Sequence, residues 1–446
     1  MTTNTPAAGA PARVLTIKDA IMLTVGIVVG AGIYKFPAVV AGAAGSSTAM
    51  IVAWLLGGAV SMVGALCYAE LACAFPSAGG DYHFLARAYG KRLAFLFAWA
   101  RISVITTGSI ALLAFVFGDF CAQIVPLGPY GPTLYGVLIV ILLTAVNYRG
   151  TRQSADAQNI FTSLEVLGLF VVIAAALLGP GAPPAAAAAV DAPLFGPGFG
   201  FAMVLVLLTY GGWNEAVYVS AEVAGDKRVL ARALIISIAV LTVLYVAVNL
   251  AFLYGLGMAG MAKSSAVGAD LLRAAWGEPG AKVLSAMVAI STFTSINSTI
   301  IVGARSAYST GRDWPVLGWL GQWHQASDSP RRALLVQGGI ALALILLGTA
   351  TRKGFETMVD FTAPVFWFFF LLTGISLFIL RKREPNAERP FRVPLYPVVP
   401  ILFCMACAYL LWSSLAYVKV GALAGVGLLV VGALVMVFLS DNKRAP

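Results

Sequence analysis

Long uninterrupted runs of apolar residues dominate the chain. Segments such as LLVVGALVMVFL and FTSLEVLGLFVVIAAALL do not alternate between apolar and polar positions. A helix needs roughly 20 apolar residues to cross a bilayer, whereas the strands of a membrane barrel alternate. The pattern therefore predicts about twelve membrane-spanning helices. Their expected ranges are 16–40, 47–73, 94–124, 131–149, 157–179, 199–223, 232–257, 281–308, 331–349, 356–381, 395–415 and 420–440.

Composition indicates the solvent that so much apolar sequence needs. The 446 residues are 60% hydrophobic and 11% charged, with a mean hydropathy of +0.89. A soluble domain carries about 25% charged residues, and no soluble fold has enough interior for this apolar content. We therefore expect an all-α protein embedded in a lipid bilayer. Residues 1–14 are rich in Ala, Pro and Thr, lack the pattern of a cleavable signal peptide, and are expected to form a short disordered tail.

The basic residues indicate how the chain is oriented in the membrane. The net charge is +10, and with a cytoplasmic N-terminus roughly 21 of the 29 Lys and Arg fall on cytoplasmic loops and about six on outer loops. This bias predicts a multi-pass protein of the cell (inner) membrane with both termini in the cytoplasm, and it explains the positive charge without nucleic acid. Loop 179–198 has no Lys or Arg and is expected outside, whereas loop 75–92 is expected to form a short surface helix inside.

Two spans are interrupted by glycine at mid-depth. The first contains VGIVVGAGIYKFP and the sixth contains LLTYGGWNEAVY. Glycine destabilises a helix interior by about 1 kcal/mol relative to alanine, and an opened backbone in lipid exposes polar groups that must be satisfied. Two such breaks, in helices that run in opposite directions, predict inverted repeats with a binding site near the membrane midplane. Close helix packing through small residues is the alternative.

The same segments resemble a known family of membrane proteins. VGAGIY followed by SMVGALCYAELACAFPSAGGDYHFL is similar to helices 1 and 2 and the first cytoplasmic loop of the amino acid–polyamine–organocation superfamily, especially its L-type amino acid transporter branch and bacterial relatives. YGGWNEAVYVSAEV resembles helix 6 of that family, STFTSINSTIIVGARSAYSTGRDWP resembles helix 8, and AERPFRVPLYPVVPILF resembles the stretch before helix 11. The resemblance implies a five-plus-five inverted-repeat fold of the leucine-transporter type, with a transport core over 15–382 and two added helices over 383–446.

In such a fold the two breaks supply the anion and cation sites that a zwitterionic amino acid needs. Amides at the start of the outer half of helix 1 can bind a carboxylate, helped by the positive helix end. Carbonyls at the end of the outer half of helix 6 can accept from an ammonium. The expected substrate-binding residues are Gly30, Ala31, Gly32, Ile33, Leu207, Leu208, Thr209, Tyr210, Trp213, Asn214 and Glu215.

Some of these positions depart from the family pattern or allow a second interpretation. The family often has a hydroxyl residue where this chain has Ala31, and an aromatic gate where it has Leu208. Tyr210 and Trp213 could form the gate instead, or could be ordinary packing aromatics. Asn214 is a buried amide that needs partners in lipid and can bridge broken helices.

Ionisable residues inside the spans cost about 2.5–3.5 kcal/mol each by insertion scales, so they indicate function or pairing. Lys35 follows the first break and Glu215 follows the second, and both are expected in neighbouring outer halves. They either form a structural ion pair, or Glu215 faces the pocket and selects a substrate amine. Glu70 and Glu222 lie nearer the cytoplasmic ends and are expected to cap helices or reach water. The embedded set consists of Lys35, Arg101, Glu165 and Glu215.

Glu165 is the candidate for ion coupling. Many members of the family have a lysine at the corresponding position of helix 5, where its ammonium substitutes for a sodium ion, so the charge is inverted in this chain. Helix 8 offers Ser291, Thr294 and Ser295 opposite, and hard oxygen ligands with one carboxylate suit a small cation. Glu165 could therefore hold sodium, exchange a proton, or pair with Arg101.

No enzyme or metal site is expected from the remaining residues. His83 and His324 fall in predicted loops, and no phosphate loop or catalytic set is present. The cysteines lie in or beside apolar spans, and the CxxC has no histidine or second pair nearby, so they are expected as small core residues. They are Cys67, Cys73, Cys121, Cys404 and Cys407.

Together these patterns predict a secondary transporter that works by alternating access and moves neutral amino acids or related small amines. It needs no cofactor beyond a coupling proton or sodium ion. An uncoupled amino acid exchanger and a polyamine or organocation carrier are the alternatives within transport. A membrane sensor and a membrane-embedded enzyme are the alternatives outside it; the glycine breaks argue against the first, and the lack of a catalytic set against the second. The patterns specify no oligomeric state.

Overall fold

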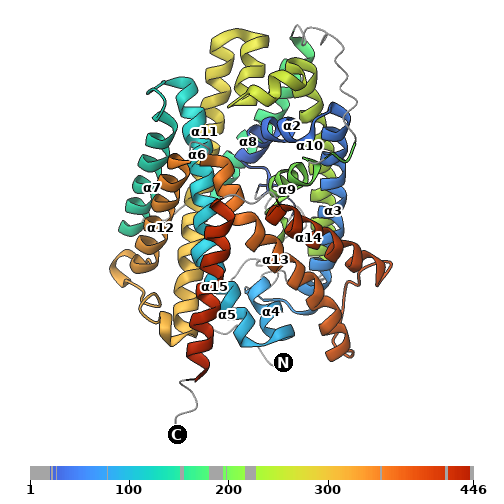
Figure 1. Ribbon diagram of the computed structural model, residues 1–446, viewed down its shortest axis with the longest axis vertical. Helices are drawn as coiled ribbons and strands as arrows, with labels where there is room; N and C mark the ends of the chain where they lie inside the picture. Colours follow the sequence, from blue (N-terminus) through green and yellow to red (C-terminus); the bar gives the residue numbers. More distant parts are fainter. Residues whose placement is uncertain are drawn as a thin grey trace, which may run out of the picture.

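The computed structural model is a bundle of helices (Figure 1). It describes residues 21, 24–26, 28–77, 79–150, 155–179, 194–196, 198–215, 228–351, 354–416 and 420–441. Within these residues there is no β-strand, only an isolated bridge between His324 and Ser329. The elements are η1 (Ala31–Tyr34), α2 (Phe36–Ala44), α3 (Ser47–Ala74), α4 (Asp81–Tyr89), α5 (Lys91–Ala100), η2 (Arg101–Ile105), α6 (Thr106–Ile124), α7 (Gly131–Arg149), α8 (Ala155–Leu178), α9 (Phe199–Tyr210), α10 (Arg228–Lys263), α11 (Val267–Asp313), η4 (Pro315–Leu317), η5 (Gln325–Ser327), α12 (Arg331–Ala350), α13 (Gly354–Arg383), α14 (Val398–Ala416) and α15 (Val420–Asp441).

Four helices lie where the apolar runs predicted them. The bounds of α3, α7, α12 and α15 agree within one residue with the expected ranges 47–73, 131–149, 331–349 and 420–440. These helices are long apolar runs bounded by polar or turn residues, so the hydrophobic pattern alone specifies both of their ends.

Three expected ranges are corrected. The range 232–257 continues to Lys263, with non-helical backbone at Gly257 (φ 66°). The range 281–308 begins already at Val267, and Gly277 (φ 73°) divides α11 in two. The residues added on both sides of this connection are too polar or too rich in glycine to resemble a membrane span. The expected span 199–223 ends as a helix at Tyr210, and 216–223 lies outside the described residues.

Eight helices among the described residues are long and apolar enough to cross a membrane. Shorter apolar stretches occupy 163–178 of α8 and 422–437 of α15. Large apolar side chains such as Leu142, Val243 and Leu346 are exposed on the outside of the bundle, as expected for surfaces that contact lipid. These features agree with an all-α membrane protein, while the twelve spans and the repeats stay predictions.

α3 has glycine at the positions where α9 and the turn after it approach most closely. A Cβ on Gly57 would overlap the side chain of Val206 in α9, and a Cβ on Gly64 would lie 2.8 Å from the ring of Trp213. α10 packs along another part of α3. Small residues permit this close helix packing, so α3 positions both α9 and the turn beyond it.

Figure 1 shows the end of the bundle where α4 lies. A buried carboxylate joins α3 to α13 at this end. Glu70 is fully buried; its Oε1 accepts from Arg381 Nε at 2.7 Å, and its Oε2 accepts from the Val393 amide at 2.6 Å. Arg389 Nε lies 3.5 Å from the same carboxylate. Glu70 therefore ties the segment between α13 and α14 to α3, and the expectation that it only caps a helix or reaches water is wrong. Glu222 lies outside the described residues.

α4 is the short helix expected in loop 75–92, but its first residue faces inward. Asp81 is buried and accepts hydrogen bonds from Tyr68 Oη at 2.6 Å and from Thr373 Oγ1 at 3.0 Å. Burial raises the pKa of the Asp81 carboxyl, and the hydrogen bond from Tyr68 lowers it in part. These contacts fasten α4 between α3 and α13.

Replacing Glu70 with alanine should strongly destabilise the protein, because Arg381 and Arg389 would keep their charges without their carboxylate. Removing one partner of a buried pair costs roughly 3–5 kcal/mol. Glu278 gives a matched control, since its side chain is 60% exposed in the pair with Arg273, and Glu278→Ala should cost only about 0–1 kcal/mol. Thermal unfolding in detergent compares the two variants, and equal melting temperatures would contradict the role given to Glu70.

Candidate functional site

The first interruption separates a helical segment that ends near Val28 from α2. Gly30 is extended (φ −131°, ψ −176°), and the turn η1 follows before α2 begins. Amides at the start of a helix have no partner within it. Among the described residues, no backbone acceptor contacts the amides of Gly30, Ala31 and Gly32. A Cβ on Gly30 would meet no atom within 4 Å, so this break presents backbone donors to open space.

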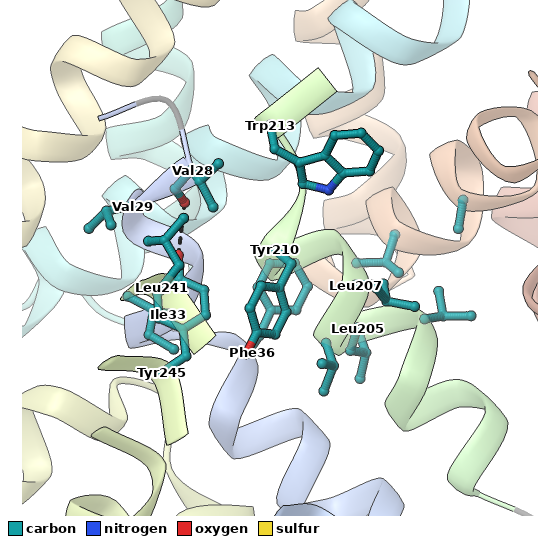
Figure 2. Close-up of a cluster of buried hydrophobic side chains, with 14 of the residues drawn as sticks. Val28, Val29, Ile33, Phe36, Leu205, Leu207, Tyr210, Trp213, Leu241 and Tyr245 are labelled. Atoms are coloured by element: carbon teal, nitrogen blue, oxygen red, sulfur yellow. Dashed lines mark hydrogen bonds between the residues drawn. The ribbon is translucent and has the colours of Figure 1, made fainter. Parts of the chain in front are cut away.

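Other backbone groups at the first break already have partners. The Ile33 amide donates to the Gly30 carbonyl at 3.4 Å, which makes Ile33 less available to a ligand than the residues before it. The Val28 carbonyl accepts from the hydroxyl of Tyr245 in α10 at 2.9 Å (Figure 2). A polar backbone group without a partner in lipid costs several kcal/mol. Tyr245 therefore stabilises the end of the first half-helix.

The second interruption begins where α9 ends at Tyr210. The Gly211 amide donates to the Leu208 carbonyl at 3.2 Å, and the Glu215 amide donates to the Gly212 carbonyl at 2.9 Å. Gly212 has a φ of 109°, a backbone conformation that residues with a side chain rarely adopt. A helix end leaves the carbonyls of its last turn without helical partners, and Leu207 and Tyr210 lie in that turn.

The two interruptions face each other. A Cβ on Gly32 would lie 3.8 Å from Cγ2 of Thr209, and α9 packs against both η1 and α2. The hydroxyl of Thr209 donates to the Leu205 carbonyl of its own helix at 3.0 Å. The amides of the first break and the carbonyls at the end of α9 therefore lie close together.

Tyr210 lies in a buried aromatic cluster beside the first break. Its ring centroid is 6.0 Å from that of Trp54 and 5.0 Å from that of Tyr245, and its hydroxyl donates to the Trp54 carbonyl at 3.1 Å. The side chain therefore packs against α3 and α10 in this conformation. Its role as a gate stays a prediction.

Trp213 belongs to a different aromatic cluster. It packs edge-on against Tyr68 with centroids 5.1 Å apart, and it contacts Phe370. Figure 2 shows Trp213 apart from Tyr210 and Phe36, whose rings overlap in this view. Asn214 follows Trp213 and is buried. Trp213 and Asn214 follow the second break, whereas the amide donors belong to the first break, near Gly30. Trp213 therefore packs at one end of the site.

Glu165 lies between η1 and α11. Its buried carboxylate accepts from the hydroxyl of Ser291, and its backbone carbonyl accepts from the hydroxyl of Tyr34 at 2.8 Å. Thr294 donates to the Ser291 carbonyl at 2.7 Å, and the carbonyl of Ser295 accepts from a residue of its own helix. The structure thus brings Glu165 and Ser291 together, while the Thr294 hydroxyl is used within α11.

The two ion pairings expected for the embedded charges are wrong. Lys35 Nζ lies 2.7 Å from Asp119 Oδ2 and donates to the Ser265 carbonyl at 2.7 Å. Arg101, the first residue of the π-helical turn η2, pairs with Glu215 at 3.2 Å. The physical reason is that the two partners lie far apart along one helical run. Asp119 is near the end of α6 and Arg101 lies in η2 before its start, so Lys35 and Glu215 lie at opposite ends of that run. Arg101 therefore neutralises Glu215, not Glu165.

Several residues that shape the site were missed from the sequence. Asp119 is an acidic residue within the apolar run FVFGDFC and lies inside the expected span 94–124, so its position could have identified it as a partner for Lys35. Tyr34, Trp54 and Tyr245 gave no signal, because tyrosine and tryptophan are common in membrane spans and only the fold shows which carbonyls they reach. None of the five cysteines forms a disulfide, and the described residues include no group of metal-binding side chains.

Known membrane transport proteins are similar in sequence to this chain over most of its length. The serine/threonine exchanger SteT of Bacillus subtilis is 26% identical over 402 residues, which cover 89% of this chain and 90% of that protein. The human Asc-type amino acid transporter 1 is 28% identical over 444 residues, covering 95% and 82%. The rat large neutral amino acids transporter small subunit 2 is 28% identical over 414 residues, covering 88% and 75%.

These relatives are transporters or exchangers rather than enzymes. The family model of amino acid permeases matches residues 15–438, which include both interruptions and every candidate site residue. With its long apolar helices, the protein is a multi-pass membrane protein, and the chain belongs to the amino acid permease family.

Proposed function

We propose that this protein is a secondary transporter that moves neutral amino acids across the cell membrane by alternating access. In this proposal its twelve spans form two inverted five-helix repeats with two added helices. The observation that carries the proposal is the open space beside Gly30, which lies next to backbone donors and close to the end of α9. In lipid, such unsatisfied backbone is tolerated where it lines a cavity or binds a ligand.

The backbone groups of the two breaks suit the two charges of an amino acid. The amides of Gly30, Ala31 and Gly32 are the donors for the carboxylate, because they lie at the start of a helix and have no backbone partner among the described residues. The carbonyls at the end of α9, at Leu207, Leu208 and Tyr210, are the acceptors for the ammonium. Ala31 has no hydroxyl, so the backbone does most of the binding.

A neutral substrate side chain fits this site better than a polyamine. Glu215 was the candidate for a second amine, but Arg101 neutralises it. Thr209 and Ile33 beside the breaks carry no charge. The names of the relatives refer to serine and threonine or to large neutral amino acids, and we extend only that substrate class to this chain.

Glu165 is the residue that we assign to ion coupling. Its carboxylate contacts Ser291 of α11, and its backbone is tied to Tyr34 of η1. A change in its charge would therefore alter the contact between the first broken helix and α11. Exchange without an ion is the second candidate mode, favoured by the name of the Bacillus subtilis relative.

The end of the bundle with α4 is the cytoplasmic end in this proposal. Arg87, Arg381 and Arg383 gather there, around the contacts of Glu384 and Glu70. Basic residues concentrate on the cytoplasmic side of membrane proteins. The end with α2 and Lys35 then faces the outside.

Transport by purified protein in proteoliposomes tests the proposed function directly. Vesicles loaded with unlabelled alanine should take up labelled alanine, serine or leucine, and putrescine should neither enter nor compete. Uptake of putrescine with no uptake of neutral amino acids would support the polyamine carrier instead.

The variant Gly30→Leu should abolish alanine uptake while the protein remains folded, because the side chain would fill the open space at the carboxylate donors. Gly339→Leu is the matched control: a Cβ at Gly339 also meets no atom within 4 Å, but this residue is exposed on α12. Uptake and melting temperature are measured for both variants. Normal uptake by Gly30→Leu would show that the first break does not bind the substrate carboxylate.

Arg101→Ala should lower the melting temperature, because the Glu215 carboxylate would lose its partner. The double variant Arg101→Ala, Glu215→Ala should recover most of that loss and should still bind alanine. Saturating alanine at 100 times Kd stabilises a protein by about 2.7 kcal/mol, which is readily seen as a thermal shift. If the double variant recovers stability but alanine does not raise its melting temperature, Glu215 binds the substrate.

Glu165→Gln should lose accumulation driven by a proton or sodium gradient and retain exchange of alanine between the two sides, because the amide cannot titrate or hold a cation. Proteoliposomes with imposed gradients measure both activities, and Glu278→Gln serves as the control for loss of an acidic residue. Accumulation by Glu165→Gln against a gradient would show that coupling lies elsewhere. A wild-type protein that ignores both gradients would be an exchanger.

A further inference from the structure

A second cavity lies between α2 and the ends of α6, α7, α12 and α13. Its volume is about 520 Å³, which is enough for a small ligand. Lys35, Asp119 and Glu356 line it together with the rings of Phe115, Tyr130 and Phe355. None of the residues assigned above to the substrate's carboxylate or ammonium lines this cavity. It adjoins them through Lys35, which directly follows η1.

Charged side chains of both signs line this cavity. Lys35 Nζ lies 2.7 Å from Asp119 Oδ2 and 5.6 Å from the ring centre of Phe355. Glu356 is half-buried and has no ion-pair partner among the described residues. The described lining thus holds two carboxylates and one ammonium. A carboxylate without an ion-pair partner attracts a cation.

The remaining lining indicates the kind of cation. Aromatic faces attract organic ammonium groups, and three rings line this cavity beside its carboxylates. Thr133 and Thr349 add hydroxyls that hydrogen-bond to each other at 3.1 Å. A bare metal ion would need several oxygen ligands around it, whereas an ammonium with a short apolar chain matches both the rings and the acids.

We propose that this cavity is an outer binding site for the ammonium group of the incoming amino acid, and that this ammonium displaces Lys35 from Asp119. The proposal rests on the proposed transport function and adds a second site to it. Displacement would change how the start of α2 is held. Lys35 joins the start of α2 to α6 through Asp119 and to the connection between α10 and α11 through the Ser265 carbonyl. An ammonium that takes Asp119 from Lys35 loosens this attachment, so the first contact with substrate would favour movement of α2.

Glu356→Gln separates this site from the site at the breaks, because it removes the charge of the carboxylate that has no ion-pair partner among the described residues and leaves the Lys35–Asp119 pair in place. In proteoliposomes of uniform orientation, it should raise KM for alanine uptake from the outside by about tenfold, equivalent to one lost charge interaction. KM for alanine leaving from the inside should not change. Glu278→Gln removes an exposed acid from the same end of the molecule and should change neither value. Equal changes in both directions, or no change in either, would overturn the proposal.

Ethylammonium chloride probes the cavity without requiring transport. It should raise the melting temperature of the wild type and of Glu278→Gln above the value in sodium chloride at equal ionic strength, and it should not do so for Glu356→Gln. Equal stabilisation by sodium, or by ethylammonium in all three proteins, would overturn the ammonium site. If ethylammonium stabilises as expected but no neutral amino acid is transported, the proposed function fails and the cavity assignment survives.

Discussion

A helix that is interrupted inside a bilayer must satisfy the backbone groups that its hydrogen-bond ladder no longer uses, and the rest of this structure depends on that constraint. Tyr245 reaches from α10 to the Val28 carbonyl, and the turn at Gly212 lets the Gly211 and Glu215 amides find acceptors close by. The amides from Gly30 to Gly32 have no backbone acceptor among the described residues, and a substrate carboxylate is the partner that we assign to them.

The embedded charges obey the same constraint at both ends of the site. Lys35 with Asp119 joins α2 to α6 at one end, and Arg101 with Glu215 joins η2 to the turn after α9 at the other. Each pair links an interrupted helix to a continuous one. A charge inside a span is costly without a partner, so breaking either pair is opposed until a ligand or water replaces the lost contact. This arrangement suits a protein that opens one end at a time.

The sequence was sufficient for the helices and the breaks but not for the contacts between charges. Apolar runs bounded by polar residues located α3, α7 and α12 within one residue, and paired glycines located both interruptions. The ion-pair partners of Lys35 and Arg101 could not be predicted in this way. Which charged side chains meet depends on how deep each lies in the membrane and on which helices are neighbours, and the sequence pattern gives neither. Likewise, the residues of α11 before Gly277 are too polar to follow the pattern of a span.

The central claim is that the facing breaks bind both charged ends of a neutral amino acid. Calorimetric titration of the wild-type protein with alanine, alanine methyl ester and N-acetylalanine tests it most directly. The ester lacks the carboxylate that the amides near Gly30 would bind, and the acetyl group removes the ammonium that the α9 carbonyls would accept. The account predicts that alanine binds and that each derivative loses at least about tenfold in affinity. Binding of the methyl ester as tightly as alanine would contradict it.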